Sequence, residues 1–326
     1  MAKTEAKISG RTRGRTAARL AAAAVAAALV GTGASAFAAD SPTPPGTFAK
    51  ASVKAAAKKA VAARSGAARH GAARADGDPN GAYPVFPLRG VDRAGNEFAY
   101  LPDFEGGFSS RMQMDEGQGG VKNAAQVDND ADGVPDGTWK WDTKGNMTFE
   151  PLDNLTTVPV GGGWNIYNTL LSPGNLGGAQ GGDLLGRDSS GTLWLYLGYG
   201  NGKLTSRYKV GGGWGQYTAL AGNGDLTGDG KPDIVARGAD GTLWLYKGTG
   251  NYRAPFEPRV KIGGGWNIYN ALVSTGDVDL DGKTDLVARD AAGALWLYRG
   301  TGDATAPYKP RVKIGTGGWN TYRLLF

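Results

Sequence analysis

A period of about 50 residues runs through most of this sequence, and it limits the fold more than any other feature. The run Leu-Trp-Leu-Tyr begins at Leu193, Leu243 and Leu295, so its copies are spaced by 50 and 52 residues. A repeat of this length is one supersecondary unit that cannot bury its own apolar side chains, so neighbouring copies must stack on one another. The chain is therefore predicted to fold as an array of similar units.

Two further markers give the number of units. A glycine-rich segment with the pattern Trp-x-x-Tyr occurs four times, beginning at Trp164, Trp214, Trp266 and Trp319. A turn glycine that precedes an apolar run recurs five times, at Gly95, Gly145, Gly191, Gly241 and Gly293. Because the second marker reaches further upstream than the first, the sequence indicates five units.

Each unit has the pattern of four short strands. In the last unit, residues 285–290 and 294–298 are two β-rich runs joined by a tight turn, and two more runs follow at 308–314 and 319–325. The 55 glycines of the chain suit a fold with many tight turns, because glycine enters positive φ at little cost. Four strands in a unit of this length are typical of a propeller blade, so we predict an all-β propeller of about five four-stranded blades.

The ends of the repeat region predict how the ring closes. The first unit lacks a Gly-Gly-Gly-Trp strand before it, whereas the last unit is followed by an extra copy at Gly317–Tyr322. We expect this C-terminal strand to complete the first blade, which would remove the exposed sheet edge that an open array leaves. An open β solenoid is the alternative architecture.

The segments before the repeats have a different composition. Residues 1–38 read as a secretory signal peptide: six lysines and arginines precede the apolar run 20–30, and Ala36-Phe37-Ala38 fits a cleavage signal. An uncleaved membrane anchor is the alternative interpretation. Residues 39–80 read as a basic linker or tail rich in alanine and proline, and residues 81–326 as the propeller. A secreted, extracellular protein is expected.

The basic character of the chain belongs to these leading segments. The net charge is +6, but residues 1–78 hold 13 Lys/Arg against 4 acids, and the remainder holds 23 against 26. The propeller is therefore acidic, which argues against a nucleic-acid partner. The tail is either solvated without a specific partner or in contact with an anionic cell surface.

Three loops carry a fixed pattern of oxygen-bearing residues. Oxygen groups stand at positions 1, 3, 5 and 9 with glycine at position 6, and the carbonyl at position 7 can add another oxygen. The candidate metal ligands are Asp128, Asp130, Asp132, Val134 and Asp136 in the first loop; Asp225, Thr227, Asp229, Lys231 and Asp233 in the second; and Asp277, Asp279, Asp281, Lys283 and Asp285 in the third. The alternative is three solvated acidic turns.

Calcium is the expected ion, because a flexible cage of protein oxygens suits Ca²⁺ better than Mg²⁺. An EF-hand is excluded: position 12 requires glutamate, and this chain has Trp139, Ala236 and Ala288 there. The loop at 175–183 and the first unit lack the pattern. We therefore expect about three ions, with weakest binding in the Thr227 loop because it has one carboxylate fewer.

These loops, with the strand and glycine turn after them, resemble the FG-GAP or VCBS-type repeats of integrin α-subunit propellers and of many secreted bacterial proteins. The Leu-Trp-Leu-Tyr and Gly-Gly-Trp-Asn-x-Tyr copies are more loosely similar to five-bladed tachylectin-type lectins. The resemblance covers about residues 83–326. It implies a calcium-binding propeller that recognises an extracellular ligand.

The tryptophans suggest what that ligand is. An aromatic plane beside an amide is a common way to hold a sugar ring, and the candidate ligand-binding residues are Trp164, Asn165, Trp214, Trp266, Asn267, Trp319 and Asn320. Core packing is the alternative role for these residues and for Trp194, Trp244 and Trp296. Lectin-like carbohydrate binding at repeated sites is the first functional hypothesis, and a protein-binding adhesive or structural propeller is the second.

An enzyme is the third and least favoured hypothesis. The chain has no cysteine and a single histidine, His70, which lies outside the repeats. Most clustered carboxylates belong to the metal loops, and a glycosidase would need a separate carboxyl pair. The candidates for such a pair outside the pattern are Glu97, Glu105, Asp115 and Glu116 of the first unit, and nothing in the sequence pairs them. We therefore expect no catalytic residues.

Overall fold

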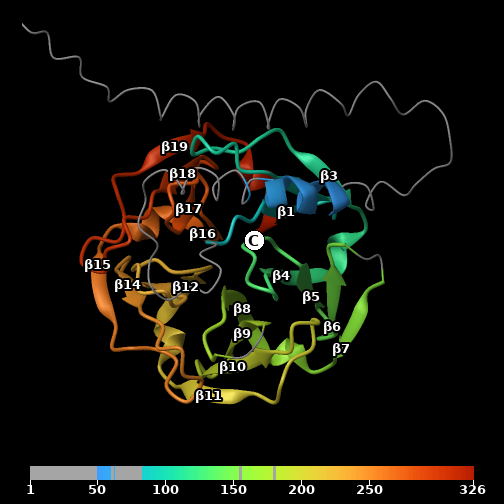
Figure 1. The fold of residues 1–326 in the computed structure, drawn as a ribbon, viewed down its shortest axis with the longest axis horizontal. Coiled ribbons are helices and arrows are strands. Elements are labelled where there is room, and N and C mark those ends of the chain that lie inside the picture. Colours follow the sequence, from blue (N-terminus) through green and yellow to red (C-terminus); the bar gives the residue numbers. More distant parts are fainter. Residues whose placement is uncertain (1–49, 60–61, 63–82, 154–155, 179–180) are drawn as a thin grey trace, which may run out of the picture.

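The five units form a closed ring of five four-stranded antiparallel sheets in the computed structural model (Figure 1). The structure describes residues 50–59, 62, 83–153, 156–178 and 181–326. The predicted signal peptide and most of the predicted linker lie outside the described residues. The all-β, five-bladed propeller is confirmed, and the open solenoid is wrong because the sheets close into a ring.

The blades follow one another along the chain. Blade 1 contains β20 (Tyr322–Leu325), β1 (Leu88–Asp92), β2 (Glu97–Tyr100) and β3 (Met112–Asp115). Blade 2 contains β4 (Val121–Val127), β5 (Gly137–Asp142), β6 (Met147–Pro151) and β7 (Val158–Gly161). Blade 3 contains β8 (Tyr167–Gly174), β9 (Gly181–Asp188), β10 (Leu193–Gly198) and β11 (Tyr208–Gly211).

The remaining two blades have the same plan. Blade 4 contains β12 (Tyr217–Ala221), β13 (Ile234–Gly238), β14 (Leu243–Tyr246) and β15 (Val260–Gly263). Blade 5 contains β16 (Tyr269–Gly276), β17 (Asp285–Asp290), β18 (Leu295–Tyr298) and β19 (Val312–Gly315). Five 3-10 turns precede the first strands of the blades: η1 (Gln118–Gly120), η2 (Trp164–Ile166), η3 (Trp214–Gln216), η4 (Trp266–Ile268) and η5 (Trp319–Thr321).

The C-terminal strand completes blade 1, as the sequence predicted. Strand β20 pairs antiparallel with β1, with Gly90 opposite Leu325 and Val91 opposite Leu324. The chain therefore ends at the middle of the ring, as Figure 1 shows. This pairing joins the two ends of the repeat region, so blade 1 needs strands from both.

Alternation along the third strand explains the Leu-Trp-Leu-Tyr repeat. In β10, β14 and β18 the leucines are buried, whereas the tryptophan and the tyrosine are half-buried. Successive side chains of a strand point to opposite faces, so the leucines and the aromatic residues face different neighbours. The repeat is thus a strand with two packed faces.

The Trp-x-x-Tyr marker forms the connection between blades. Each 3-10 turn is held by a backbone hydrogen bond to the hairpin glycine of the preceding blade; for example, Trp214 N donates to Gly191 O at 2.9 Å. Gly191 has φ +77°, and a Cβ there would lie 2.6 Å from Gly215 N. These turns pack closely on the preceding hairpin, which explains the glycine at every hairpin turn.

Four of the five junctions between blades contain the same aromatic pair. A tryptophan from the 3-10 turn stacks on the tyrosine of the third strand, with ring centroids 4.8, 4.5, 4.4 and 4.5 Å apart. The pairs are Trp164–Tyr196, Trp214–Tyr246, Trp266–Tyr298 and Trp319–Tyr100. We call these the aromatic junctions.

The junction between blades 1 and 2 is built from charges instead. Glu97 is fully buried and pairs with Arg89, and Lys140 lies 2.7 Å from Glu97 and 2.9 Å from Glu150. Burial alone would raise the pKa of Glu97, but Arg89 and Lys140 outweigh it and hold that pKa below its ordinary value. Glu97 is therefore part of the ion cluster that joins these two blades.

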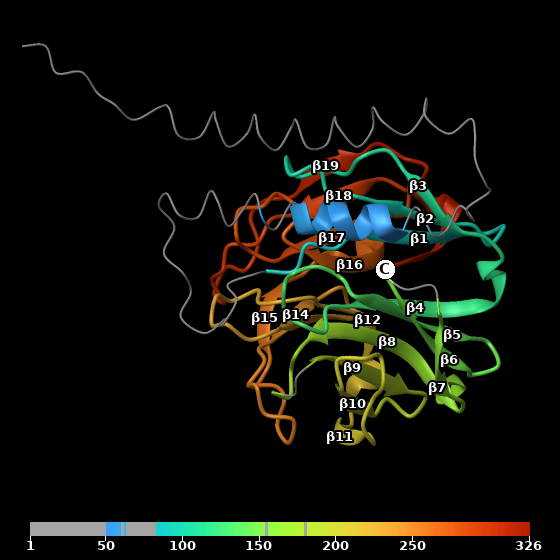
Figure 2. The ribbon, with the colours of Figure 1, turned by 45° about the vertical axis from the view of Figure 1, so that its right-hand side comes forward.

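A short helix covers the same region. Residues 50–59, inside the predicted linker, form a helix whose Val53, Ala56 and Ala57 are buried. Val53 and Ala56 pack in one cluster with Leu101, Met114 and Leu152 of the propeller, and the helix lies beside β1 and β3 in Figure 1 and again in the turned view of Figure 2. The solvated tail expected from composition does not describe these ten residues, because their alanines and valine form an apolar face at helical spacing.

No helix among the described residues is long and apolar enough to cross a membrane.

Candidate functional site

The three acidic loops occupy the same place in three blades. Each connects the first strand of its blade to the second: β4 to β5, β12 to β13, and β16 to β17. The loop at 175–183, predicted to lack the site, is the fourth copy and connects β8 to β9. Blade 1 has no such loop, because its first strand, β20, is the end of the chain. The acidic loops therefore lie on one face of the ring.

Two of the predicted ligands in each loop also shape its backbone. The aspartate at position 1 accepts a hydrogen bond from the glycine N–H at position 6, at 2.8, 2.7 and 2.9 Å in the three loops. The aspartate at position 9 accepts from the N–H at position 2, at 2.8, 3.0 and 3.0 Å. The position-6 glycines have φ values of +84°, +81° and +85°. Carboxylates at both ends of the loop thus bend the chain so that the acids converge.

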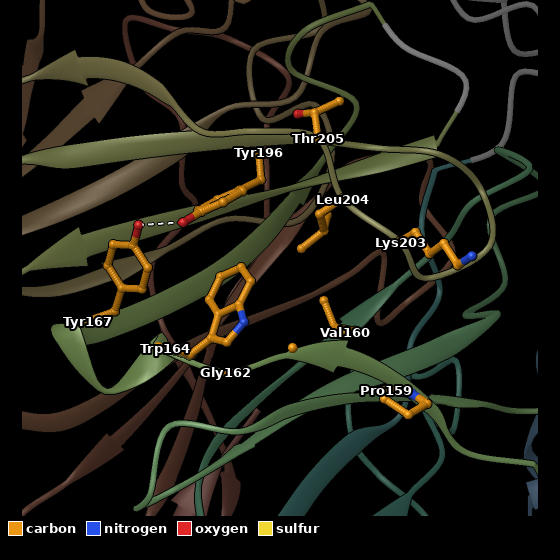
Figure 3. Close-up of a pocket in the computed structure, with 11 residues that line it drawn as sticks. Pro159, Val160, Gly162, Trp164, Tyr167, Tyr196, Lys203, Leu204 and Thr205 are labelled. Atoms are coloured by element: carbon orange, nitrogen blue, oxygen red, sulfur yellow. Dashed lines mark hydrogen bonds between the residues drawn. The ribbon is translucent and has the colours of Figure 1, made fainter.

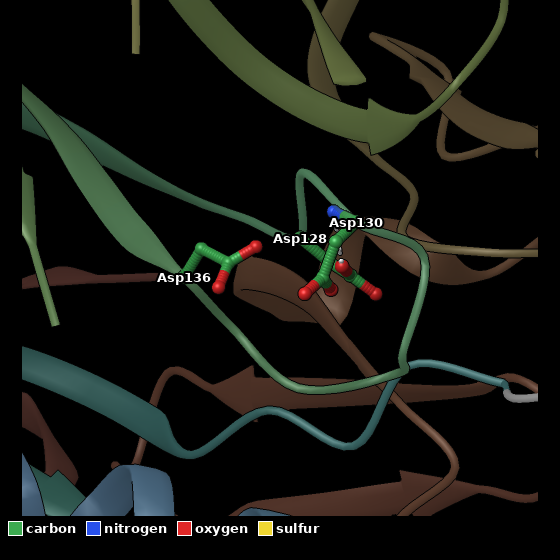
Figure 4. A group of neighbouring side chains, drawn as sticks. All are labelled: Asp128, Asp130 and Asp136. Carbon is green, nitrogen blue, oxygen red and sulfur yellow. Dashed lines mark hydrogen bonds between the residues drawn. The ribbon is translucent and has the colours of Figure 1, made fainter. Parts of the chain in front are cut away.

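Two of the loops bring three carboxylates together. Asp128, Asp130 and Asp136 offer oxygens within 4.8 Å of one another, and Figure 4 shows these side chains side by side. In the third loop the equivalent group is Asp277, Asp279 and Asp281, under the same limit. The predicted ligands Asp132 and Asp285 lie outside these groups; Asp132 accepts a hydrogen bond from Val134 N at 2.9 Å.

Burial and mutual repulsion make these carboxyl groups weak acids. Burial raises the pKa of Asp128 to about 7, and Asp132, Asp136 and Asp130 add to the rise. Burial also raises the pKa of Asp285 to about 8. A cation among the ionised carboxylates would remove both the repulsion and the unfavourable burial of charge.

The second loop differs in its third position. Burial raises the pKa of Asp233 to about 7, and Asp225 and Asp229 contribute. Thr227 stands where the other loops have aspartate, and its Oγ1 is buried with no hydrogen-bond partner among the described residues. Buried polar atoms rarely lack a partner. The second loop does not bring three carboxylates as close as the other two loops do, among the described residues. A buried hydroxyl oxygen without a partner in a loop with Asp225, Asp229 and Asp233 is nonetheless an oxygen donor that suits a hard cation.

Basic side chains at the rims of the loops were not predicted. Lys54 of the 50–59 helix lies 2.9 Å from Asp136. Lys247 lies 3.4 Å from Asp229, and Arg299 lies 2.9 Å from Asp279. These partners come from distant segments, so the spacing within the loops carries no signal for them.

The loop in blade 3 keeps the aspartate at position 9 and lacks the acids at positions 1, 3 and 5. Asp183, at position 9, is fully buried and accepts hydrogen bonds from Gly177 N at 2.7 Å and Gly198 N at 3.0 Å. The equivalent bond to the third strand is made by Asp233 to Gly248 N at 2.9 Å and by Asp285 to Gly300 N at 2.8 Å. The position-9 aspartate therefore has a structural role that needs no ion.

The tryptophans predicted to bind a ligand lie mainly inside the aromatic junctions. Trp164, Trp214 and Trp266 are 7%, 6% and 7% exposed. Trp319 is half-buried, and the neighbouring Asn320 donates to Ala291 O at 2.9 Å. These positions give each tryptophan a packing role, whether or not a ligand also contacts it.

The two other candidate asparagines lie next to hairpin turns. Oδ1 of Asn165 would be 2.8 Å from a Cβ at Gly145, and Oδ1 of Asn267 would be 2.9 Å from a Cβ at Gly241. Both asparagines follow a buried tryptophan and rest on the hairpin of the preceding blade, as Asn320 does. The three asparagines thus share one structural position.

The tryptophans of the third strands, Trp194, Trp244 and Trp296, are covered by arginines. Arg207, Arg259 and Arg311 lie over the rings of Trp194, Trp244 and Trp296, with the guanidinium carbon 4.1, 4.1 and 4.2 Å from the centroid. Cation–π contact of this kind favours a packed strand surface. These three rings each have a side chain of the same blade stacked on them.

The closed ring and its acidic loops define a repeat β-propeller, and the family comparison agrees. Residues 225–288 match the FG-GAP-like repeat family, and this stretch includes the second acidic loop and the third. The match and the five-bladed fold fit an FG-GAP repeat propeller, as the sequence resemblance indicated. The first acidic loop, at 128–136, lies outside the matched residues.

Solved structures give more distant likenesses. Prp20p from Saccharomyces cerevisiae is 10% identical, with a TM-score of 0.36 over 71% of this chain and 61% of that chain. A triple mutant of AofleA from Arthrobotrys oligospora is 9% identical, with a TM-score of 0.42 over 74% and 75%. BBS1N in complex with ARL6DN is 11% identical, with a TM-score of 0.32 over 66% and 63%. The chain thus spans less than two thirds of the first and third of these structures, and no curated protein matches it.

Proposed function

We propose that this chain is a secreted, calcium-stabilised recognition propeller. The observation that carries the proposal is the recurrence of one acidic loop at the same place in three blades, two of them inside the FG-GAP match. Three or four carboxylates crowded together cost stability unless a cation accompanies them. Calcium would pin the turn between the first and second strands of blades 2, 4 and 5.

The residues available to each ion differ. Asp128, Asp130 and Asp136 would supply the first site, and Asp277, Asp279 and Asp281 the third. In the second loop, Thr227 Oγ1 would replace one carboxylate, which makes this the weakest of the three sites. Because every side-chain donor is an oxygen, a hard divalent cation fits better than a transition metal.

We further propose that the recognised ligand is an extracellular carbohydrate, with a protein partner as the alternative. A ring of similar blades presents related surfaces side by side, which suits recognition more than chemistry. A non-enzymatic role is part of the proposal: Glu97, a buried acid outside the loops, is held by Arg89 and Lys140. An anionic surface for the basic segment stays a prediction, although Lys50 and Lys54 already pair with acids of the propeller.

Binding of the full chain to a glycan array, in calcium and again in chelator, tests this function. We expect selective binding that free sugar competes away and that chelation weakens by loosening the loops. A blank array together with capture of a defined extracellular protein would favour the protein-binding alternative. A blank array with hydrolysis of an arrayed glycan would contradict the non-enzymatic proposal.

A further inference from the structure

The four aromatic junctions differ in the side chain that closes them. In blades 4 and 5 a third aromatic residue joins the pair: Phe256 lies 5.9 Å from Trp214, and Tyr308 lies 6.2 Å from Trp266, centroid to centroid. In blade 1 the third residue is Phe108, which packs in the cluster of Tyr100 and Trp319. In blade 3 the third residue is Leu204, which packs in the cluster of Trp164 and Tyr196.

The backbone shows that these four residues are equivalent. Each forms an isolated antiparallel bridge with a residue at the end of its third strand: the last strand residue in blade 3 and the second residue after the strand in the others. The bridges are Pro102 with Phe108, Gly198 with Leu204, Gly248 with Phe256, and Gly300 with Tyr308. The side chains therefore enter the junctions from the same direction. Leu204 is the one of the four that has no aromatic ring.

A cavity of about 400 Å³ lies at the blade 3 junction, between blades 2 and 3 (Figure 3). Its volume is within the range of roughly 300–1,000 Å³ that small-ligand pockets occupy. Val160 and Gly162 border it from blade 2 and the following turn, and Trp164, Tyr196 and Leu204 border it from η2 and blade 3. The cavity is thus the space that an aromatic plug fills elsewhere.

The lining combines apolar faces with polar edges. Trp164, Val160 and Leu204 supply the apolar surface. The hydroxyl groups of Tyr167 and Tyr196 are hydrogen-bonded to each other at 2.5 Å, Arg207 donates to the Tyr167 oxygen at 3.3 Å, and these groups give the cavity a polar edge. The one charged residue of the lining is the exposed Lys203, whose amino group points away from Trp164 in Figure 3. Such a lining suits an uncharged ligand with one apolar face and a hydroxylated edge.

Gly162 borders the cavity without a side chain, and the equivalent Gly212, Gly264 and Gly317 of the other aromatic junctions also have open space at the Cβ position. The φ of Gly162 is not in the left-handed region, and the only atom near a Cβ placed on it is Asn146 Oδ1, at 4.0 Å. Neither backbone strain nor crowding therefore requires glycine at this position. Its lack of a side chain keeps the floor of the cavity open.

We propose that the cavity between blades 2 and 3 binds a single pyranose unit, and that the aromatic plugs close the equivalent positions of the other aromatic junctions. The proposal rests on the proposed carbohydrate recognition and names the place and number of its sites. It replaces a set of repeated sites around the ring with one site in each chain.

The test uses the calcium-loaded full chain labelled with 5-fluorotryptophan, titrated with methyl glycosides of neutral hexoses and N-acetylhexosamines. Fluorine resonances of the nine tryptophans report which rings a glycoside contacts. We expect one perturbed resonance, assigned to Trp164 by its loss in Trp164→Phe. Leu204→Phe, which copies the plug of blade 4, should weaken binding at least tenfold while leaving the melting temperature close to that of wild type.

Two matched variants make the outcome decisive. Gly162→Ala should weaken binding several-fold, whereas Gly212→Ala at the plugged junction should not. Phe256→Leu should open a second site and add a perturbed Trp214 resonance. Unchanged binding in Leu204→Phe would overturn the assignment of the site. A wild-type chain that binds arrayed glycans or a protein partner, yet shows no shift with any glycoside, would overturn the pyranose site and leave the recognition function standing.

Discussion

Two equivalent loops, β16–β17 in blade 5 and β8–β9 in blade 3, differ in charge. They share the hydrogen bonds that the position-9 aspartate accepts from backbone N–H groups, which we call the frame of the loop. Both end in a fully buried aspartate, Asp285 or Asp183, that accepts a hydrogen bond from a glycine N–H after the third strand. In blade 5 the acids Asp277, Asp279 and Asp281 gather in front of that frame, and in blade 3 residue 177 of the loop is a glycine. The comparison separates two roles. The position-9 aspartate holds the backbone in both blades, whereas the gathered charge of positions 1, 3 and 5 is present only in blade 5, where position 1 also bonds to the loop backbone.

The largest expected effect is loss of the shared frame. Asp183→Ala and Asp285→Ala each leave two backbone N–H groups without an acceptor, at about 1–3 kcal/mol for each group. Both variants should lose about 2–6 kcal/mol of unfolding free energy in urea titrations with chelator present. Asp303→Ala, an exposed aspartate outside these loops, is the control. A stable Asp183→Ala chain would show that the frame does not depend on this carboxylate.

The two aspartates should also differ in pH dependence. Burial raises the pKa of Asp183 to about 6 and that of Asp285 to about 8, from an ordinary value of 3.8. A raised carboxyl pKa means that the folded chain binds the proton more tightly than the unfolded chain does. The contribution of the carboxyl group to stability is therefore highest at low pH and falls as pH rises towards the folded pKa.

In chelator, the unfolding free energy of wild type minus that of Asp183→Asn should fall between about pH 4 and pH 6 and then level off. The difference for Asp285→Asn should continue to fall to about pH 8. Calcium should reverse the second trend, because it binds the ionised carboxylates, and should leave the first unchanged. Identical pH windows for the two variants would break the comparison.

A smaller effect is expected from changing charge within an intact frame. Asp130→Asn gives the first loop the carboxylate count of the second, and Thr227→Asp does the reverse. We expect calcium affinity, measured by calorimetry, to fall about tenfold in the first variant and to rise in the second, a change of about 1.4 kcal/mol. In chelator, stability should rise slightly for Asp130→Asn because one of four repelling carboxylates is removed, and it should fall slightly for Thr227→Asp because a fourth carboxylate joins the loop. Calcium affinities that stay at the wild-type value in both variants would mean that the number of carboxylates does not set the affinity of a loop.

Features that depend on local sequence patterns were predicted, whereas features that depend on contacts between distant residues were not. The 50-residue period, the strand alternation and the extra C-terminal strand are local patterns, and they were sufficient to predict the blades and their closure. The spacing of the acids also indicated that carboxylates gather in the loops, and three do so in the first loop and in the third, whereas Asp132 and Asp285 lie outside these groups. Loop formation by Asp183 was not predicted, because its partner Gly198 is 15 residues away.

Contacts between distant segments account for the rest. Lys54 reaches Asp136 across 82 residues, and Glu97 meets Lys140 across 43. The tryptophans of the 3-10 turns resemble sugar platforms in sequence, but stacking on the next blade makes them junction residues first. Leu204 became informative only after the fold placed it opposite Phe108, Phe256 and Tyr308.

The melting temperature of the full chain in saturating calcium, in chelator and in magnesium tests the central claim most directly. A site filled at one hundred times its dissociation constant adds about 2.7 kcal/mol, which is about 5–10 °C for a domain of this size. We predict such an increase for calcium, a smaller one for magnesium, and a loss of part of the calcium effect in Asp130→Asn. The same melting temperature in calcium and in chelator would contradict a structural role for the ion in these loops.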